Sequence, residues 1–297
     1  MKCSHPTNVR SSRISQAVPP APSRYSAFDR SLRDRLVRIA AATILIGVSA
    51  CSKPRDANVD KANACSPSAF DSLLGKYVHA GKVDYASLKV SKSDLESFNA
   101  YLGRIGTCDV SSLNRLAREA FWVNAYNAFN IKGVLDHWPV DNIKSIEGFL
   151  DKKPWHVANT DLTLNDIEYK QLIPARKDAR NHFAVVCADQ GSVPLEPHAY
   201  TAEDFETALD KKARDFVADP NSFQVDIPGK RVRVSMLFSP EWYEKDFLAD
   251  ERFHGRKAVE YLIPYVDKET ADFLASGDYA VSYIDWNWSL NGAMSQK

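Results

Sequence analysis

The residues with the clearest chemical potential lie between positions 182 and 197. The apolar run 183–186, Phe-Ala-Val-Val, is short and partly β-branched, which predicts a buried strand. His182 precedes this run and Cys187 ends it, and a polar loop leads on to a helix predicted from Thr201. A cysteine between a buried strand and a helix N-terminus can be activated as a nucleophile. The alternative is that Cys187 is a small buried apolar residue.

Three residues of this stretch are candidate catalytic groups: Cys187, His182 and Ser192. In an extended strand, residues five apart face opposite sides, so His182 is predicted to be a poor base for Cys187 unless a bulge intervenes. Ser192 has no readily ionised form and would need a base within about 3 Å.

A second group of candidates lies in the longest helical pattern, which runs from about residue 112 to 137 and stops before Pro139. Asn124 and Asn127 are three residues apart on one face of this helix, and aromatic residues flank them. A buried amide without partners costs about 1–3 kcal/mol. These two side chains are therefore predicted either to bind neighbouring loop backbone or to form part of a binding site, for example by holding an oxyanion.

The third group is at the end of the chain, where Trp286, Asn287, Trp288 and Asn291 follow a predicted strand over 279–284. Aromatic rings with amides beside them suit a glycan or peptide ligand. Packing of the tryptophans in the core is the alternative.

The composition argues against some classes of function. The 297 residues contain 38 Lys and Arg and 38 Asp and Glu, which gives no basic patch for nucleic acid. The five cysteines show no paired spacing typical of a zinc site, and no helical pair of histidines suggests another metal. We expect no metal, no cofactor and no nucleic-acid partner.

The sequence leading up to Cys51 predicts a membrane anchor. After three arginines, residues 39–50 form an uncharged run that is too short to span a bilayer but suits a secretory signal. The run ends Val-Ser-Ala before Cys51 and resembles the lipobox of bacterial lipoproteins, which implies cleavage before Cys51, a lipid on its sulfur, and a place in the cell envelope. Ser52 resembles the signal for the outer membrane, facing the periplasm.

These observations divide the chain into a disordered leader and signal peptide (1–50), the lipidated cysteine and a polar tether (51–65), and one domain (66–295). In the mature chain Cys65 and Cys108 could pair, which would leave Cys187 as the single thiol. Within the domain, helices are predicted over 70–79, 93–102, 112–137 and 202–218, and a hairpin over 223–234. This mixture predicts an α+β class, with helices packed around a small sheet.

Several segments together resemble domain-of-unknown-function family 547: residues 77–85, 121–128, 164–168, 182–187 and 288–291. The family has no settled activity, but its usual cysteine, histidine and aspartate would suit a thiol hydrolase with a papain- or transglutaminase-like fold. This sequence departs from the family pattern at three positions. Ser192 occupies the slot of a second cysteine, Lys132 that of a histidine, and Asn287 that of an aspartate.

Two functions follow from the sequence. The first is a non-catalytic binding or scaffold lipoprotein of the envelope, because the residues that the family pattern would use for chemistry are replaced. The alternative is a thiol-dependent hydrolase or acyl transferase centred on Cys187, with Asn124 or Asn127 supporting the reaction.

Overall fold

The computed structural model describes residues 64–173 and 178–292. The predicted signal peptide, Cys51 and the tether up to residue 63 lie outside these residues. Within the described part, none of the helices has the length and apolarity that crossing a membrane requires.

Helices dominate the described chain. The α-helices are α2 (Ser68–Tyr77), α3 (Tyr85–Val90), α4 (Lys92–Ile105), α5 (Arg115–His137), α6 (Leu164–Asp166), α8 (Asn181–Ala184), α9 (Phe205–Ala218), α10 (Glu244–Ala249) and α11 (Lys268–Ser276). A π-helix, Ile167–Leu172, continues α6, and 3₁₀ helices cover Val110–Ser112, Ile143–Ser145, Met236–Phe238 and Ala258–Tyr265.

The strands form three small sheets. They are β1 (Val78–His79), β2 (Lys82–Val83), β3 (Trp155–Val157), β4 (Thr160–Leu162), β5 (Phe223–Asp226), β6 (Arg231–Ser235) and β7 (Ala280–Ile284). β1 pairs with β2 and β3 with β4 as antiparallel hairpins, while β6 lies between antiparallel β5 and parallel β7. Helices with small sheets confirm the predicted α+β class.

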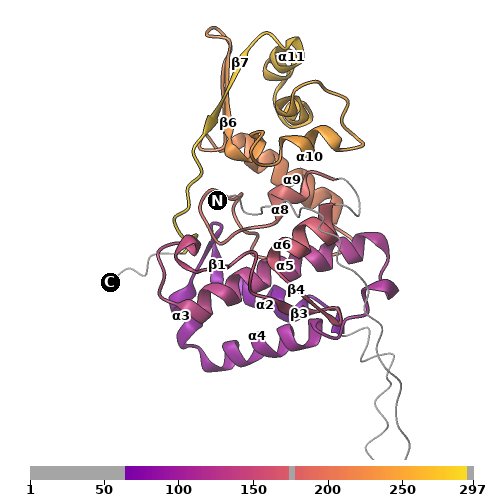
Figure 1. Cartoon of the computed structure of the whole chain (residues 1–297), viewed down its shortest axis with the longest axis vertical. Helices are drawn as coiled ribbons and strands as arrows, with labels where there is room; N and C mark the ends of the chain where they lie inside the picture. Colours follow the sequence, from indigo (N-terminus) through magenta and orange to yellow (C-terminus); the bar gives the residue numbers. More distant parts are fainter. Residues whose placement is uncertain (1–63, 174–177, 293–297) are drawn as a thin grey trace, which may run out of the picture. The chain divides into compact units, whose positions relative to one another are not determined.

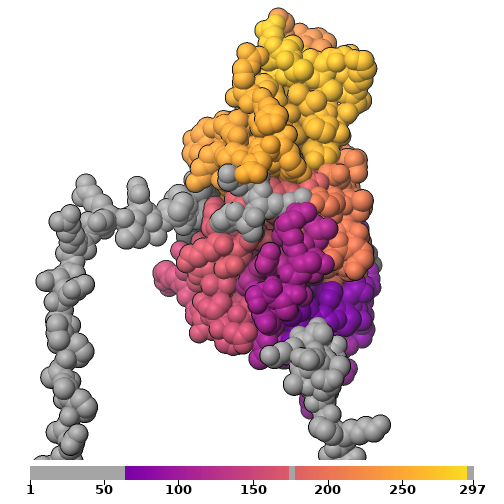
Figure 2. Space-filling model, turned by 90° about the vertical axis from the view of Figure 1, so that its right-hand side faces the viewer, coloured from indigo at the N-terminus to yellow at the C-terminus, as the bar shows by residue number. Residues whose placement is uncertain are grey.

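The apolar side chains gather in two clusters. One surrounds α5 and includes side chains of α2, α3 and α4, and the other lies between the β5–β7 sheet, α10 and the 3₁₀ helix Ala258–Tyr265. Figure 1 shows the two groups of elements, indigo to magenta for the first and orange to yellow for the second. In Figure 2 the same colours separate at the surface of the described residues. Trp286 and Trp288 pack against both clusters.

α5 supports the first cluster. Asn114 caps it, because its side-chain oxygen accepts the Ala117 N–H at 2.9 Å. From Glu119 to Ile131 every residue is buried, as the aromatic-rich sequence predicts, and the helix ends at His137 before the Trp138–Pro139 pair. The hairpin predicted over 223–234 is also confirmed, as β5 and β6.

The predicted strand over residues 183–186 is wrong. Residues up to Ala184 complete the short helix α8, and the chain is extended only from Val185 onward. A short apolar run fits a buried helical turn as well as a strand. The extended part pairs with a side chain in place of a neighbouring strand: Asn127 accepts the Val186 N–H at 2.8 Å and donates to the Ala184 carbonyl at 3.0 Å.

The predicted helix start at Thr201 is early by several residues. α9 begins at Phe205. Thr201 donates its N–H and its hydroxyl to Asp204, at 2.9 Å each, just ahead of the helix.

The chain after β7 returns to the N-terminal elements, as the yellow trace in Figure 1 shows. Asn291 accepts the Val83 N–H at 2.9 Å through its carbonyl. Bridges also pair Ser289 with Asn142 and Leu290 with Asp189. The last described residues therefore join segments that are far apart in the sequence.

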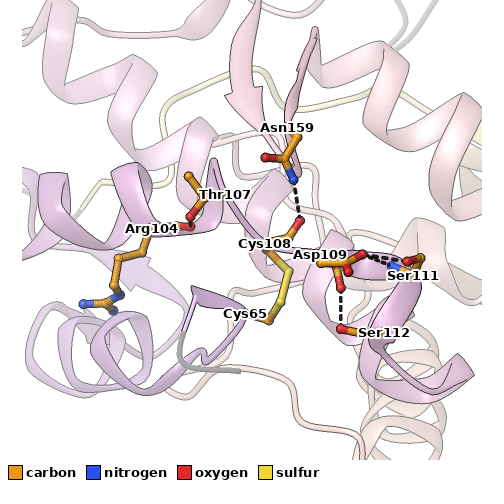
Figure 3. The surroundings of a disulfide bond; sticks show 8 residues. All are labelled: Cys65, Arg104, Thr107, Cys108, Asp109, Ser111, Ser112 and Asn159. Carbon is orange, nitrogen blue, oxygen red and sulfur yellow. Dashed lines mark hydrogen bonds between the residues drawn. A yellow bond between two sulfur atoms is a disulfide. The ribbon is translucent and has the colours of Figure 1, made fainter. Parts of the chain in front are cut away.

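Cys65 and Cys108 form a disulfide with a sulfur–sulfur distance of 2.03 Å, which is the pairing that the sequence had left open. The bond ties the start of the described domain to the chain after α4. Figure 3 shows Asn159 donating to the Cys108 carbonyl at 3.3 Å, so the turn between β3 and β4 is fixed at the same place.

Candidate functional site

The loop of residues 187–192 lies against the C-terminal segment of residues 286–291. Gln190 and Gly191 donate their backbone N–H groups to the carbonyls of Ser289 and Asn287, at 2.9 Å each. Asn291 donates its backbone N–H to the Ala188 carbonyl at 3.1 Å. The tertiary structure thus brings together two of the sequence-predicted groups, which are about a hundred positions apart.

Asp189 lies at the centre of this contact and is 1% exposed. One carboxylate oxygen accepts the N–H and the hydroxyl of Ser192 at 2.9 Å each, and the other accepts the indole N–H of Trp286 at 2.9 Å. Burial raises the pKa of Asp189 to about 6, although these hydrogen bonds oppose the shift. The preceding residue, Ala188, has a φ of 55°, which is uncommon outside glycine.

Three tryptophans form a cluster beside Asp189. The ring centroids of Trp286 and Trp288 are 6.2 Å apart, and Trp242 lies 5.0 Å from the first and 5.9 Å from the second. Trp242 is buried, whereas Trp286 and Trp288 are partly exposed and Asn287 between them is exposed. We call Trp286, Asn287 and Trp288 the tryptophan surface.

A lysine lies at the edge of the tryptophan surface. The exposed Lys144 places its ammonium 5.1 Å from the centroid of the Trp288 ring, which is within the range of a cation–π contact. The surface therefore combines aromatic, amide and cationic groups.

Asn291 does not belong to the tryptophan surface. It is 4% exposed, and its side-chain oxygen accepts the hydroxyl of Tyr85 at 2.9 Å. Its role in the structure is to attach the end of the C-terminal segment to α3.

Cys187 and Ser192 are neighbours, as their positions in one loop suggest. Ser192 accepts the Cys187 N–H at 3.1 Å through its hydroxyl oxygen, and the Cys187 sulfur lies 3.3 Å from the hydroxyl of Tyr126. Cys187 is buried and is disulfide-bonded in the full 297-residue chain, whereas the expectation of a single thiol concerns a mature chain without Cys3 and with a lipid on Cys51. The Ser192 hydroxyl proton points to the Asp189 carboxylate.

His182 lies elsewhere in the core, between two carboxylates. Its Nδ1 is 3.1 Å from Glu168 Oε1, its Nε2 is 3.2 Å from Asp246 Oδ2, and its ring packs 4.0 Å from that of Tyr243. Burial alone lowers the pKa of His182, but hydrogen bonds to Asp246 and Glu168 and their charges outweigh burial and hold the pKa above its ordinary value. Both ring nitrogens are thus engaged away from Cys187.

Asn124 and Asn127 hold backbone, the first of the two roles that the sequence left open for them. Asn124 donates to the Tyr200 carbonyl at 2.8 Å and accepts the Tyr200 N–H at 2.9 Å. Asn127 makes the equivalent pair of bonds to residues 184 and 186. Each amide uses its oxygen and its nitrogen in this way, so α5 positions two irregular segments of the chain.

Sequence reasoning missed Asp189, Trp242, Glu168 and Asp246 as partners of the predicted residues. Glu168 lies in a motif of the family resemblance and Asp189 is two residues from Cys187, but no local pattern predicts how far these residues lie from their partners. Trp242 and Asp246 had no signal beyond an apolar helical pattern. In the described part of the chain, the His, Cys, Asp and Glu side chains form no cluster of three or more that could hold a metal ion.

Residues 110–217 match the family model described as "Protein of unknown function, DUF547". The matched segment runs from the 3₁₀ helix before α5 to the end of α9 and contains Asn124, Asn127, His182, Cys187 and Ser192. The tryptophan surface lies beyond it. A search of curated proteins and a search of solved structures found no match.

The buried histidine gives a prediction on stability. His182→Gln removes the cation that lies between Glu168 and Asp246, so the free energy of unfolding should fall by about 3–5 kcal/mol near pH 6. Because the folded pKa is raised, the contribution of the imidazolium is complete below the unfolded pKa of about 6.5 and is lost as the pH rises through the folded pKa. Urea unfolding of the full chain from pH 6 to 9 should show the difference between wild type and variant shrinking with pH.

His156→Gln is the matched control, because His156 pairs with Asp161 at 2.8 Å but is exposed. Its loss should change the free energy of unfolding by less than about 1 kcal/mol. Equal effects of the two substitutions would contradict the buried ion pair.

The close approach of Gly191 to Trp286 gives a second prediction. A Cβ on residue 191 would lie 2.5 Å from the Trp286 ring, so Gly191→Ala should displace the indole and lower the free energy of unfolding by about 1–3 kcal/mol. Tryptophan emission should shift to the red as the ring becomes more exposed. Gly103→Ala serves as the control, since the new methyl meets no atom within 4 Å and alanine favours helix α4 by about 0.5–1 kcal/mol. An unchanged emission spectrum in Gly191→Ala would argue against the contact.

Proposed function

We propose that this chain is a lipid-anchored binding or scaffold protein of the bacterial cell envelope, and that the tryptophan surface binds a glycan. The observation that carries the proposal is the engagement of the candidate catalytic groups in the structure itself. His182 is held between two carboxylates, and Ser192 donates its hydroxyl proton to Asp189. A Cys187 nucleophile would need a base within hydrogen-bond reach, and His182 is engaged by Glu168 and Asp246 instead. The Ser192 hydroxyl does face a carboxylate, but Asp189 is buried and also binds the Trp286 indole.

The tryptophan surface supports the choice of ligand. Partly exposed indole rings offer flat apolar faces on which sugar rings stack, and the exposed amide of Asn287 can pair with hydroxyl groups. Lys144 adds a cation that favours a glycan bearing carboxylate groups. A peptide could use the same rings, so a peptide belongs in the test.

The anchor rests on the sequence around Cys51. A short apolar run after arginines and the small residues before this cysteine support cleavage and lipidation, with the protein in the outer membrane facing the periplasm. The tether up to residue 65 would then join the lipid to the domain.

Ligand binding tests the proposal directly. The full chain should bind tetra-N-acetylchitotetraose or an acidic oligosaccharide such as tetragalacturonate, measured by isothermal titration calorimetry, with a proline-rich decapeptide as the peptide arm. Trp288→Ala should weaken glycan binding at least about fivefold, because it removes an aromatic contact worth about 1 kcal/mol.

Trp155→Ala is the matched control for this experiment. Trp155 is also partly exposed and has the Lys153 ammonium 4.0 Å from its ring centroid, but it lies on β3, apart from the tryptophan surface. If the chain binds neither glycan, the proposed ligand is refuted. Tighter binding of the decapeptide would show that the ligand is a peptide.

The anchor has a separate test. Wild type expressed in a bacterium and labelled with an alkyne palmitate analogue should carry the label, and Cys51→Ser should abolish it. A mature chain that lacks Cys3 and carries its lipid on Cys51 would leave Cys187 without a cysteine of its own chain to pair with, while Cys65 and Cys108 remain paired. Mass spectrometry of the envelope protein under non-reducing conditions that found Cys187 in a disulfide would contradict the anchor.

A further inference from the structure

The loop of residues 187–192 contacts Trp286 in two ways, in addition to the packing of its ring against Trp242 and Trp288. Its indole N–H donates to Asp189 Oδ2 at 2.9 Å, and its ring lies directly against Gly191, where a Cβ would not fit. The other oxygen of Asp189 holds the loop itself, through Ser192. The single carboxylate thus links the loop to the ring.

We propose that Asp189 is the positioning residue of the tryptophan surface: by holding the Trp286 indole, its carboxylate sets the geometry that the ligand meets. The role in binding rests on the proposed function, whereas the control of the indole does not. Asp189 is buried beneath the surface and acts through Trp286.

The position of Asp189 supports this role over simple packing. A buried carboxylate is unfavourable unless hydrogen bonds compensate it, and here the donors are the indole of Trp286 and two groups of Ser192. The bridge between Asp189 and Leu290 and the backbone bonds of Gln190 and Gly191 fix the backbone around it. The indole, by contrast, is oriented by apolar contacts with Trp242, Trp288 and Gly191 and by one hydrogen bond, which is the one to Asp189.

The groups that face Asp189 allow the ionisation of its carboxyl group to be measured separately from theirs. The donors on Trp286, Ser192 and Gly191 carry no charge, and the titratable groups near Asp189 include Tyr85 on α3 and Tyr126 on α5, whose pKa values burial raises well above their ordinary value. These phenols stay neutral in the physiological range. With burial raising the pKa of Asp189 to about 6, the change in its charge can be separated from theirs by pH.

The test is the indole N–H resonance of Trp286 in ¹⁵N-labelled full chain, assigned by its loss in Trp286→Phe. In wild type this resonance should shift between pH 4.5 and 8 with a midpoint near 6, because the acceptor of the N–H changes charge. Asp189→Asn should abolish the pH-dependent shift, and in chains that bind the glycan it should weaken binding at least about threefold at pH 7.5. Asp285→Asn is the matched control, since Asp285 is the exposed acid next to Trp286 and its loss should leave the titration in place.

The outcomes separate the two proposals. A Trp286 resonance that has the same chemical shift in wild type and Asp189→Asn at every pH overturns the role of Asp189. A titration that persists in Asp189→Asn also overturns it. If wild type binds neither glycan nor peptide, the proposed function fails, while the resonance still decides whether Asp189 controls the indole. Glycan binding that is unchanged in Asp189→Asn overturns the positioning of the surface.

Discussion

The constraint on which the structure depends is the pairing of backbone groups in a buried segment that belongs to no sheet. Residues 185–192 run through the protein with Val185 to Asp189 all buried, so their N–H and carbonyl groups need partners that a neighbouring strand would normally supply. Asn127 supplies them at one end, and the backbone of residues 287–291 supplies them at the other. The loop is therefore stable only when α5 and the C-terminal segment are both in place.

This constraint explains why the residues of the site are engaged with one another. Ser192 and Asp189 complete the pairing of the loop, and Asp189 extends it to Trp286. His182, which lies three residues before this segment, is held by Glu168 from the π-helix and Asp246 from α10. The segment thus joins both apolar clusters through its polar groups, and the tryptophan surface is the part of this arrangement that remains partly exposed.

The sequence by itself determined the elements whose signal is local. The apolar and aromatic run of α5, the stop before Pro139 and the alternating hairpin of β5 and β6 all arise from short-range rules, so their places were predictable. The need of Asn124 and Asn127 for hydrogen-bond partners followed from the high free-energy cost of an unpaired buried amide. The α+β class followed from the mixture of these patterns.

Only the tertiary structure decided which residues pair with one another. The run before Cys187 has the composition of a strand, yet a strand exists only when another lies beside it, and here Asn127 occupies that place. The same holds for the site: the contact of Trp286 with Asp189 and that of Asp246 with His182 join residues 97 and 64 positions apart. Such contacts depend on how the whole chain packs, and no local pattern of residues encodes the distance between them.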